Sequence, residues 1–478
     1  MSTSGESDTI ATETPADATP RPSGSTNRRQ PFGGGFLETI SSGWAERPDL
    51  APPLRAQAPF AAIRRDAVSA AFPGRRLVVP AGELKQRSND TDYPFRAHSA
   101  FSHLTGWASD SEPDSVLVFD PRDGGGHDIT LFFRERADRT TSEFYADASI
   151  GEFWIGPRPA LAGVAGELGI ETSHVDEFTR DDDDLVVGDD EELTRFVSEL
   201  RLVKDEYELA ELRLAVEVTA KGFEDVIREL PRVIEHPRGE RIVEGVFHQR
   251  ARSDGNTVGY DTIAASGPHA CYLHWTRNDG AVVPGDLILI DAGVEVDSLY
   301  TADITRTLPV SGRFTEVQRR VYETVREAAD AAFAVAKPGV RFRAVHEAAM
   351  AVIATRVAEW GLIPVTADEA LDADHGGQHR RYMVHGTSHH LGIDVHDCAQ
   401  ARREMYYDGV LEPGMVFTIE PGLYFQIDDI TVPEEYRGIG VRIEDDVLVT
   451  ADGVENLSAA IPRTADEVEQ WMLRLGAQ

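Results

Sequence analysis

The 478-residue sequence has little cysteine and a deficit of positive charge. Its two cysteines, Cys271 and Cys398, are too few for a disulfide framework and are typical of a protein in a reducing compartment. Because 47 lysines and arginines oppose 82 aspartates and glutamates, the formal net charge is −35. We therefore expect no nucleic-acid partner, since binding phosphates requires a basic surface. We interpret the excess acid as a solvated surface.

Long apolar runs are also missing from the sequence. It contains no stretch of about 18 apolar residues, the length that a membrane-spanning helix needs. Its first residues lack the basic segment followed by an apolar core that marks a secretory signal. We therefore expect no membrane partner and a cytoplasmic location.

Composition changes along the chain predict a tail and two domains. Residues 1–50 are rich in Ser, Thr, Pro and Gly, which predicts a disordered tail. Residues 51–203 carry short β runs bounded by turn residues, which indicates a smaller α/β domain. Residues 204–478 predict an α+β domain, in which further β runs alternate with helical patterns at 204–230, 316–336 and 341–360.

Two acidic residues directly follow β runs of the second domain. Asp291 comes after the run at 287–290, and Glu420 comes after the run at 416–419. An acid in such a position, considered alone, is more typical of a turn than of a ligand. Because the pattern recurs within one domain, we favour a shared site over independent turns.

Strand alternation groups two further acids with polar neighbours. Asp303 and Thr305 fall on one face of a predicted strand, so we expect the Thr305 hydroxyl to orient the Asp303 carboxylate. Arg442 and Glu444 share a face of another strand, and we expect Arg442 to keep Glu444 ionised. A surface salt bridge is the alternative interpretation of this second pair.

A cluster of histidines follows at 385–396. His385 and His389 are four residues apart, as in zinc-protease helices, but that motif requires a Glu directly after the first His, where Gly386 stands. The Gly, Thr and Ser between the two histidines also disfavour a helix. We predict a loop or strand that carries one metal-ligating imidazole and two other functional imidazoles. Histidines satisfied within the core are the alternative.

Together these patterns give four carboxylates and one imidazole, which form a hard, oxygen-rich ligand set. Such a set favours Mn²⁺ or Co²⁺ over a thiolate-type zinc site. It carries enough charge for two divalent ions, which lie about 3.5–4 Å apart in such centres and share a hydroxide that can attack a carbonyl. The expected reaction is hydrolysis.

Further segments extend the pattern over residues 60–465. They are Ser88 to Arg96, Leu273-His274-Trp275-Thr276, Asp291-Ala292-Gly293, the histidine cluster, Glu420-Pro421-Gly422-Leu423-Tyr424, and Tyr436 to Asp446. In these segments the chain resembles the proline-specific aminopeptidases (Xaa-Pro aminopeptidase, or aminopeptidase P) of the pita-bread metallopeptidase family M24B. The resemblance implies an α+β fold in which a C-terminal pita-bread catalytic domain follows a smaller α/β N-terminal domain.

The resemblance also implies a role for each matching residue. Asp303 and Glu444 bridge two metal ions, Mn²⁺ in preference to Co²⁺, in a site formed by Asp291, Asp303, His389, Glu420 and Glu444. His396 steadies the tetrahedral intermediate, and Glu420 takes the proton from the attacking water. The pocket for proline and its carbonyl is lined or organised by His274, His385, Tyr424 and Arg442.

The implied activity is release of the N-terminal residue from peptides with proline second, by a homo-oligomer, either a dimer or a tetramer. Because an Xaa-Pro bond is a tertiary amide without an N–H, the site must recognise a ring and a carbonyl. A prolidase, which cleaves only Xaa-Pro dipeptides, is one alternative, and a non-catalytic pita-bread module that binds peptides or proteins is another. The large N-terminal domain disfavours a methionine aminopeptidase. Arg402 and Arg403 are the two candidates for contact with longer substrates.

Overall fold

The structure is a computed structural model that describes residues 32–48, 52–89 and 91–476. Most of the predicted disordered tail lies outside the described residues. Within the described part of that tail, Gly34–Ile40 forms helix α1. The chain divides into two compact units, the smaller comprising Met1–Pro48, Leu84–Phe95 and Arg136–Arg158, and the larger comprising Asp49–Glu83, Arg96–Glu135 and Pro159–Gln478.

The smaller unit is organised by aromatic side chains and one ion pair. Its elements after α1 are β2 (Gln86–Ser88), β3 (Thr91–Asp92), α4 (Ser142–Ala146) and α5 (Glu152–Ile155). Phe32 and Phe36 stack with their ring centroids 4.5 Å apart, and both meet the Tyr145 ring edge-on. Arg47 pairs with one carboxylate oxygen of Glu152. The other oxygen of that carboxylate accepts a hydrogen bond from a backbone N–H of the same unit.

The larger unit begins with a five-stranded mixed sheet, which we call the N-terminal sheet. Its strands, in the spatial order β6-β5-β4-β1-β7, are β6 (Glu171–His174), β5 (His127–Phe133), β4 (Val116–Pro121), β1 (Leu77–Pro80) and β7 (Leu185–Val186). The Val, Leu and Phe side chains of β1 and β4 are buried, as the short β runs predict. The helices of this region are α2 (Ala58–Ala71), α3 (Ser99–Thr105), α6 (Leu161–Leu168) and α7 (Glu191–Glu199).

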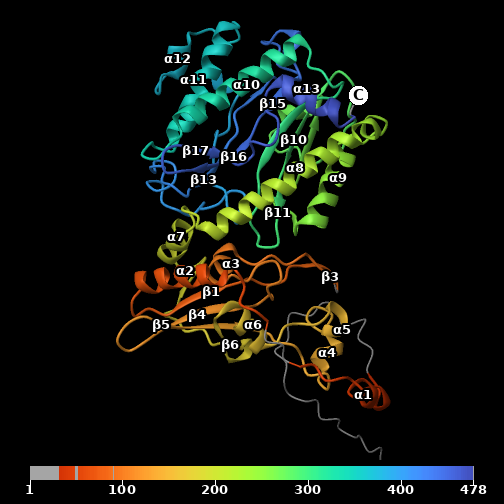
Figure 1. Ribbon diagram of the computed structural model, residues 1–478, viewed down its shortest axis with the longest axis vertical. Helices are drawn as coiled ribbons and strands as arrows, with labels where there is room; N and C mark the ends of the chain where they lie inside the picture. Colours follow the sequence, from red (N-terminus) through yellow and green to blue (C-terminus); the bar gives the residue numbers. More distant parts are fainter. Residues whose placement is uncertain (1–31, 49–51, 90, 477–478) are drawn as a thin grey trace, which may run out of the picture. The chain divides into compact units, whose positions relative to one another are not determined.

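Four long helices dominate the rest of the larger unit, which we call the C-terminal region. They are α8 (Glu206–Ile234), α9 (Gly239–Asp254), α10 (Glu316–Val335) and α11 (Arg343–Glu359). Asp205 and Glu208 form a capping box that starts α8, and Thr315 and Gln318 form one that starts α10. Figure 1 shows α8 beside α9 and α10 beside α11, with strands between the two pairs in that view. The three helical patterns of the sequence thus correspond to α8, α10 and α11.

Several small antiparallel sheets occupy the centre of this region. One contains β9 (Ile263–Ser266), β10 (Leu287–Ala292) and β12 (Ile304–Pro309), and another contains β13 (Val416–Ile419), β16 (Asp445–Val449) and β17 (Val454–Asn456). Two strand pairs complete the centre, β14 (Gly422–Tyr424) with β15 (Gly440–Arg442) and β8 (Thr257–Val258) with β11 (Val294–Glu295). The remaining helices of this region include α12 (Ala367–Leu371) and α13 (Ala465–Arg474).

Strand register brings together residues that are distant in the sequence. Asp291 of β10 lies opposite Thr305 of β12, and Arg442 of β15 lies opposite Gly422 of β14. In the sheet that contains β13 and β16, Asp446 lies opposite Thr418. Because each pairing fixes which side chains share a face, the acidic ends of these strands converge at one place.

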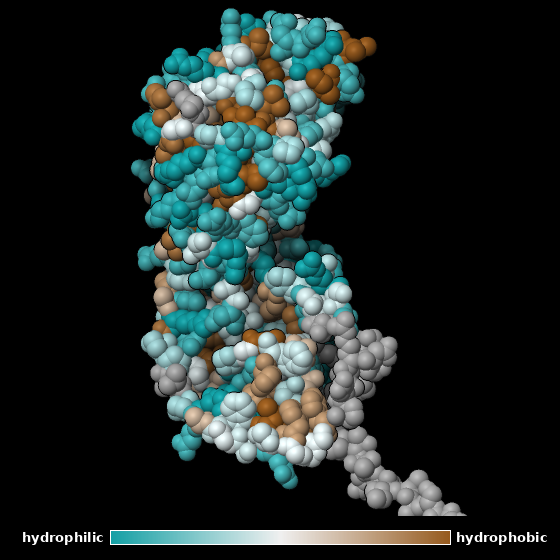
Figure 2. All heavy atoms as spheres, turned by 90° about the vertical axis from the view of Figure 1, so that its right-hand side faces the viewer, coloured by the Kyte–Doolittle hydropathy of each residue, from teal (hydrophilic) through white to brown (hydrophobic). Residues whose placement is uncertain are grey.

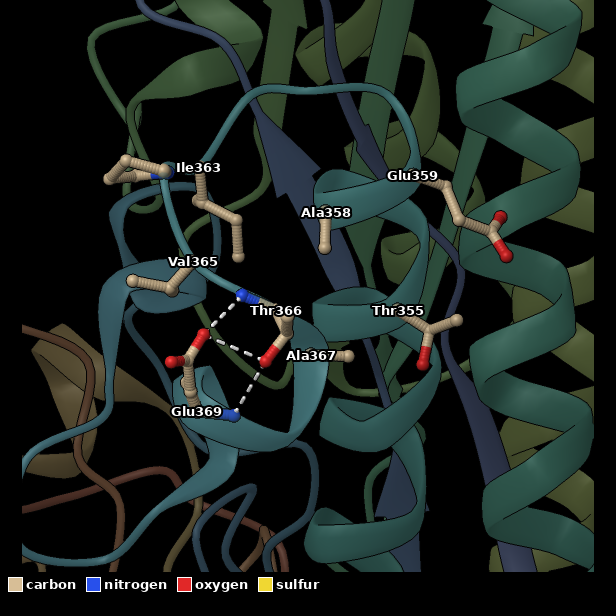
Figure 3. A pocket seen from close by; sticks show the side chains of 9 residues that line it. Thr355, Ala358, Glu359, Ile363, Val365, Thr366, Ala367 and Glu369 are labelled. Carbon is tan, nitrogen blue, oxygen red and sulfur yellow. Dashed lines mark hydrogen bonds between the residues drawn. The ribbon is translucent and has the colours of Figure 1, made fainter.

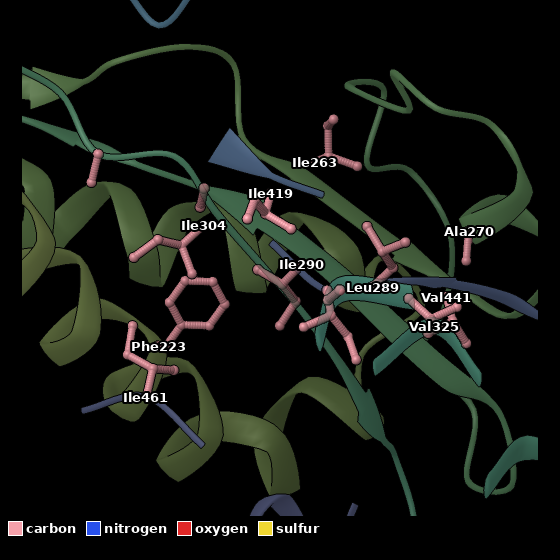
Figure 4. Packing of buried hydrophobic residues seen from close by; sticks show 14 of the residues in the cluster. Phe223, Ile263, Ala270, Leu289, Ile290, Ile304, Val325, Ile419, Val441 and Ile461 are labelled. Atoms are coloured by element: carbon pink, nitrogen blue, oxygen red, sulfur yellow. The ribbon is translucent and has the colours of Figure 1, made fainter. Parts of the chain in front are cut away.

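The core beneath this place is apolar and closely packed. Phe223 of α8, Ile290 of β10, Ile304 of β12 and Val325 of α10 are fully buried in one cluster (Figure 4). Burying a side chain of this size contributes about 1.5–3 kcal/mol. The strands that carry the acids therefore rest on a rigid support.

The surface contrasts with this core. Figure 2 shows a face on which hydrophilic side chains predominate over the C-terminal region, with apolar residues scattered among them. None of the helices in the described part of the chain combines the length and the apolar character that a membrane span requires.

Candidate metal centre

The C-terminal region brings the five predicted metal-ligating residues together. Four are carboxylates at strand ends: Asp291 in β10, Asp303 before β12, Glu420 after β13 and Glu444 between β15 and β16. His389 lies in a loop beside β13, where its N–H donates to Thr418 Oγ1 at 3.2 Å and its carbonyl accepts the Thr418 N–H at 2.9 Å. The predicted convergence of strand ends on one site is therefore present in the structure.

The tightest part of the cluster contains Asp303, His389 and Glu444. Each of these residues offers one ligand atom, and the three atoms lie within 4.8 Å of one another. His389 Nε2 is 3.2 Å from Asp303 Oδ2 and 3.6 Å from Glu420 Oε1. The other ring nitrogen, Nδ1, faces the His390 carbonyl at 3.2 Å. A proton on Nδ1 leaves the Nε2 lone pair directed at the carboxylates, which is the tautomer that a metal ligand requires.

Tyr260, between β8 and β9, joins two of the carboxylates. Its hydroxyl lies 2.7 Å from Asp291 Oδ1 and 2.5 Å from Asp303 Oδ1. Burial and the charges of these two acids raise the pKa of Tyr260 well above its ordinary value, so the phenol keeps its single proton. One proton cannot neutralise two carboxylates, and the pair therefore retains negative charge.

Arg442 and Thr305 contact different carboxylates from those that strand alternation predicts. Arg442 pairs with Asp291, and Thr305 Oγ1 donates to Glu444 Oε2 at 2.7 Å. The expectation that Thr305 orients Asp303 is wrong. The reason is cross-strand register: Thr305 lies opposite Asp291, and the Glu444 N–H donates to the Thr305 carbonyl at 3.1 Å. Arg442 forms its ion pair with Asp291, and its charge also acts on Glu444 as expected, because it opposes the rise in the pKa of that acid.

Two acids of this centre, Glu444 and Glu420, hold protons more tightly than usual. Burial, followed by the charges of Asp303 and Glu420, raises the pKa of Glu444 well above its ordinary value. Burial also raises the pKa of Glu420 to about 7, although His389 and Arg442 oppose the rise. Burial opposes protonation of His389, but Asp303 and Glu420 outweigh it and raise the pKa of His389 to about 9. The centre therefore has an excess of buried negative charge that a cation would neutralise.

His385 and Tyr424 form a second part of the site. His385 Nδ1 lies 2.7 Å from the Gly386 carbonyl, and His385 Nε2 lies 2.8 Å from Tyr424 Oη. Arg442 Nη1 donates to the same phenol oxygen at 3.1 Å. Burial and the Arg442 charge lower the pKa of His385 to about 3, so this imidazole is neutral at physiological pH.

His396 and His274 lie at the exposed side of the centre. The His396 ring meets the His389 ring edge-on, with the centroids 4.2 Å apart. The charge of His274 opposes protonation of both His385 and His396, which places His274 near the same centre. Both His274 and His396 are exposed, whereas His385 and His389 are only partly so. The four histidines thus form a rim around the carboxylates.

Buried Glu240 of α9 fixes the segment that carries His274. It accepts hydrogen bonds from His269 Nδ1 at 2.7 Å and from Trp275 Nε1 at 3.0 Å. It also accepts the backbone N–H groups of Ser266 and Gly280, at 2.8 and 2.7 Å. A single carboxylate therefore ties together the residues on both sides of His274.

Two residues that form hydrogen bonds in this site, Tyr260 and Asp446, were not predicted from the sequence. Nothing in the spacing around Tyr260 indicates its position between two acids. Asp446 had a signal, because alternation from Glu444 places it on the same face. It accepts the Asp303 N–H at 3.2 Å, and burial together with the Asp303 charge raises its pKa well above the ordinary value.

The two arginines considered for longer substrates have carboxylate partners. Arg402 Nε lies 2.7 Å from Glu199 Oε1. Arg403 Nε lies 3.0 Å from Asp408 Oδ2. Both arginines are exposed, so these pairs contribute little to stability and can be exchanged for other anions.

A surface hollow beside α11 and α12 is unrelated to the centre (Figure 3). Within it, the Thr366 N–H donates to Glu369 Oε2 at 2.8 Å, and the Glu369 N–H donates back to Thr366 Oγ1 at 3.3 Å. These bonds are the capping box of α12. The predicted site residues are not among those that line this hollow.

Comparison with known proteins agrees with this geometry. A family model described as "Metallopeptidase family M24" matches residues 210–451, and one described as "Aminopeptidase P, N-terminal domain" matches residues 61–191. The chain is 52% identical over 465 residues to Xaa-Pro aminopeptidase 1 of Streptomyces coelicolor, covering 92% of each protein. It is 33% identical over 444 residues to Xaa-Pro aminopeptidase of Escherichia coli, covering 87% of this chain and 97% of that one.

Solved structures give the same result. Aminopeptidase PepP of Pseudomonas aeruginosa superposes with a TM-score of 0.75 at 31% identity, covering 89% of this chain and 100% of its own. Zinc-substituted E. coli aminopeptidase P in complex with product superposes with a TM-score of 0.75 at 30% identity, covering 89% of this chain and 100% of its own. The predicted resemblance and the predicted fold, a pita-bread domain after a smaller α/β domain, are confirmed. The chain belongs to metallopeptidase family M24 and carries an aminopeptidase P N-terminal domain before its M24 domain.

Proposed function

We propose that this protein is a dinuclear-metal aminopeptidase that releases the N-terminal residue from peptides with proline in second position. The observation that carries the proposal is the convergence of Asp303, His389 and Glu444, whose ligand atoms lie within 4.8 Å of one another. Relatives that are 52% and 33% identical along nearly their whole length are named Xaa-Pro aminopeptidases, which supports this substrate class.

The proposed metal site holds two divalent cations, Mn²⁺ by preference or Co²⁺, on Asp291, Asp303, His389, Glu420 and Glu444. The residues fit such ions because the donor set is hard and oxygen-rich and because its buried negative charge is uncompensated. Bound cations would supply Lewis acidity for water activation and for polarising the scissile carbonyl. Tyr260, Thr305 and Arg442 hold the carboxylates in place.

Glu420 is proposed to accept the proton of the attacking water. Its carboxylate lies beside His389 and within 3.6 Å of His385 Nδ1, at the partly exposed side of the cluster. Burial raises the pKa of Glu420 to about 7, whereas neighbouring positive charge lowers this pKa. Glu420 would therefore be ionised once cations neutralise the negative charge of the centre. An ionised carboxylate within reach of the nucleophile meets the requirement for a general base.

The histidine rim is proposed to recognise the Xaa-Pro bond. His396, exposed next to His389, is in position to donate to the oxygen that gains negative charge during attack. His385 is neutral and tied to Tyr424, and it therefore presents a fixed, weakly polar surface suited to a proline ring. His274 closes the same side, and Arg442 holds both Tyr424 and Asp291.

We further propose an N-terminal domain over residues 51–203 and a catalytic domain over residues 204–478. The Lys204 N–H donates to the Gly414 carbonyl at 2.9 Å, which supports a start of the catalytic domain at this residue. A cytoplasmic homo-oligomer, dimer or tetramer, completes the proposal, and the buried free thiols Cys271 and Cys398 are compatible with a reducing compartment. Light scattering of the purified protein tests the oligomer, and a monomer would contradict it.

A peptide-length series tests the substrate. With Mn²⁺, Co²⁺ or Zn²⁺ added, we expect hydrolysis of an Xaa-Pro-Pro tripeptide and of longer Xaa-Pro peptides. Hydrolysis should be slower when alanine replaces the proline that is the second residue of the peptide. Activity confined to Xaa-Pro dipeptides would identify a prolidase instead. Failure to bind close to two divalent ions per chain at saturating Mn²⁺, together with no hydrolysis of any of these peptides, would favour a non-catalytic peptide-binding module.

A further inference from the structure

Two carboxylates flank His396 in the loop that carries it. Asp394 comes two residues before His396, and Asp397 follows it directly. The loop backbone is closed by a hydrogen bond from the Gly392 N–H to the Asp394 carbonyl at 3.1 Å and by one from the Asp397 N–H to the His390 carbonyl at 2.9 Å. His396 is exposed, whereas Asp397 is buried, so the loop is anchored from behind.

Asp397 is held by two cations that precede α8. Arg201 Nε donates to Asp397 Oδ1 at 2.8 Å, and Lys204 Nζ lies 3.3 Å from Asp397 Oδ2. Lys204 Nζ also donates to the Arg201 carbonyl at 2.7 Å. A Cβ at Gly392 would lie 2.2 Å from Asp397 Oδ2, so the loop packs directly onto this ion cluster. All three charged side chains are buried, which makes the geometry rigid.

Asp394 is held from the N-terminal sheet region. Ser99 Oγ, at the start of α3, donates to Asp394 Oδ1 at 2.5 Å. Arg96 Nη1 lies 3.4 Å from the same oxygen, and Arg96 Nη2 donates to the Ile393 carbonyl at 2.6 Å. Arg201 Nη2 reaches Asp394 Oδ2 at 3.7 Å. Arg201 therefore contacts both of the carboxylates on either side of His396.

The residues that hold the loop lie outside the segment that matches the M24 family. That match begins at residue 210, whereas Arg96, Ser99, Arg201 and Lys204 precede it. Arg96 and Ser99 fall within the aminopeptidase P N-terminal match at 61–191. All of them belong to the same compact unit as His396. The N-terminal part of the chain thus contributes contacts to a loop of the proposed active site.

We propose that Arg96, Ser99, Arg201 and Lys204 are positioning residues that hold His396 over the metal centre through Asp394 and Asp397. This inference rests on the proposed function, because it uses the proposed role of His396. The His396 imidazole is exposed, and Asp394 and Asp397 on either side of it are held by the contacts described above. A displacement of about 1 Å in a catalytic group can reduce the rate about a hundredfold, which is the physical reason for such an anchor.

Asp394→Ala is the cleanest variant for testing this role. Removing this carboxylate leaves neither arginine without an ion pair. Arg96 still pairs with Glu295 at 2.7 Å, and Arg201 still pairs with Asp397 at 2.8 Å. We expect kcat on an Xaa-Pro-Pro tripeptide to fall about tenfold, with KM changed less than about twofold, because the loop moves while the substrate pocket does not. Asp394→Asn, which keeps an acceptor for Ser99, should restore most of the activity.

The same substitution in a His396→Ala background separates positioning from general destabilisation. If Asp394 acts through His396, Asp394→Ala should lower kcat by less than about twofold there. An equal loss in both backgrounds, or no loss in the wild-type background, would overturn the inference. The matched control is Glu455→Ala, which removes a partly exposed carboxylate that pairs with Arg213 at 2.6 Å away from the loop; its kcat should be unchanged.

Hydrogen–deuterium exchange provides a readout that does not depend on activity. In metal-free protein, Asp394→Ala should accelerate exchange of the amides at 392–398, and Glu455→Ala should not. Unchanged exchange at 392–398 would contradict the anchor. If His396→Ala retains wild-type kcat, the proposed role of His396 fails, and the inference fails with it. If His396→Ala is impaired while Asp394→Ala is not, only the inference fails.

Discussion

The metal centre and the Asp397 cluster are two of the buried groups of charged residues in the larger unit, and they differ in the balance of positive and negative charge. In the metal centre, the acids Asp303, Glu420 and Glu444 face His389 and Arg442, and burial raises the pKa of each acid. In the second cluster, one carboxylate faces two cations. Burial opposes ionisation of Asp397, but the charges of Arg201 and Lys204 outweigh it and hold its pKa below the usual range.

The difference distinguishes a binding site from a structural anchor. A buried carboxylate that pairs with enough positive charge stays ionised without further help. Carboxylates that outnumber their cations must instead bind protons or metal ions. The metal centre therefore carries a binding capacity that the Asp397 cluster lacks. Proteins commonly tolerate such destabilising charge only where function requires it.

The largest expected effect comes from Glu444→Gln. The amide still accepts the Thr305 hydroxyl, but it lacks the negative charge that the proposed metal site would use. We expect kcat/KM to fall on the order of 1,000-fold, and Mn²⁺ binding measured by calorimetry to weaken strongly. In chelator, the variant should be more stable than the wild-type protein in urea unfolding, because its folded state no longer has to bury or protonate this carboxylate. A less stable metal-free variant would show that Glu444 is a structural residue.

Asp397→Asn should have the opposite effect on stability and make the protein less stable than the wild type. Removing the carboxylate leaves Arg201 and Lys204 buried without their partner, which costs about 3–5 kcal/mol of unfolding free energy. The loss should be the same in chelator and in Mn²⁺, since no metal is bound at this cluster. Urea unfolding with and without Mn²⁺ measures both quantities. A cost that vanishes when Mn²⁺ is added would contradict the separation of the two clusters.

Stability against pH should also distinguish the clusters. The folded-state pKa of Glu420 is raised from 4.5 to about 7, so the folded protein binds this proton more tightly than the unfolded chain. Metal-free protein should therefore lose stability as the pH rises through that window, by about 2 kcal/mol from Glu420 alone. The depressed pKa of Asp397 acts in the reverse direction, and its contribution is lost only as the pH falls below 3.8.

Unfolding in urea with chelator, at about pH 5 and about pH 7.5, measures this change. Saturating Mn²⁺ should remove the loss, because metal ions compete with protons for the same carboxylates. Glu420→Gln should flatten the metal-free profile. Metal-free protein that gains stability over this range would contradict the excess of buried acid in the centre.

The smallest expected effect concerns Tyr260→Phe. The substitution keeps the ring and removes the hydroxyl that contacts Asp291 and Asp303, so Mn²⁺ affinity should fall about tenfold. The matched control is Tyr322→Phe, which removes a buried hydroxyl that donates to the Arg463 carbonyl at 2.9 Å. This control should lower stability without changing Mn²⁺ affinity. Equal effects on affinity would show that Tyr260 has no special role at the metals.

Local sequence patterns were sufficient to predict the elements and the acids at their ends. Asp291 and Glu420 follow apolar strands, and this signal depends only on neighbouring residues. The helices α8, α10 and α11 were predictable for the same reason, since their apolar residues recur at helical spacing. The family resemblance adds the roles of the histidines, which spacing alone leaves open between functional and core residues.

Partner choice could not be predicted, because it depends on contacts between distant strands. Alternation along a strand places Thr305 beside Asp303 and Arg442 beside Glu444. In the folded protein, cross-strand register instead lets Thr305 donate to Glu444 and lets Arg442 pair with Asp291. Tyr260 was missed for the same reason. Its position between two acids results from the packing of β8 and β9 against β10 and β11, which local spacing does not encode.

The most direct test of the central claim is the number of Mn²⁺ ions bound at the carboxylate cluster, measured by equilibrium dialysis and atomic emission. We predict that wild-type protein and Asp394→Ala each bind two ions per chain at saturation, while Glu444→Gln binds fewer. Failure of the wild-type protein to bind Mn²⁺, Co²⁺ or Zn²⁺ would contradict the claim that the excess of buried acid in this centre is a metal site.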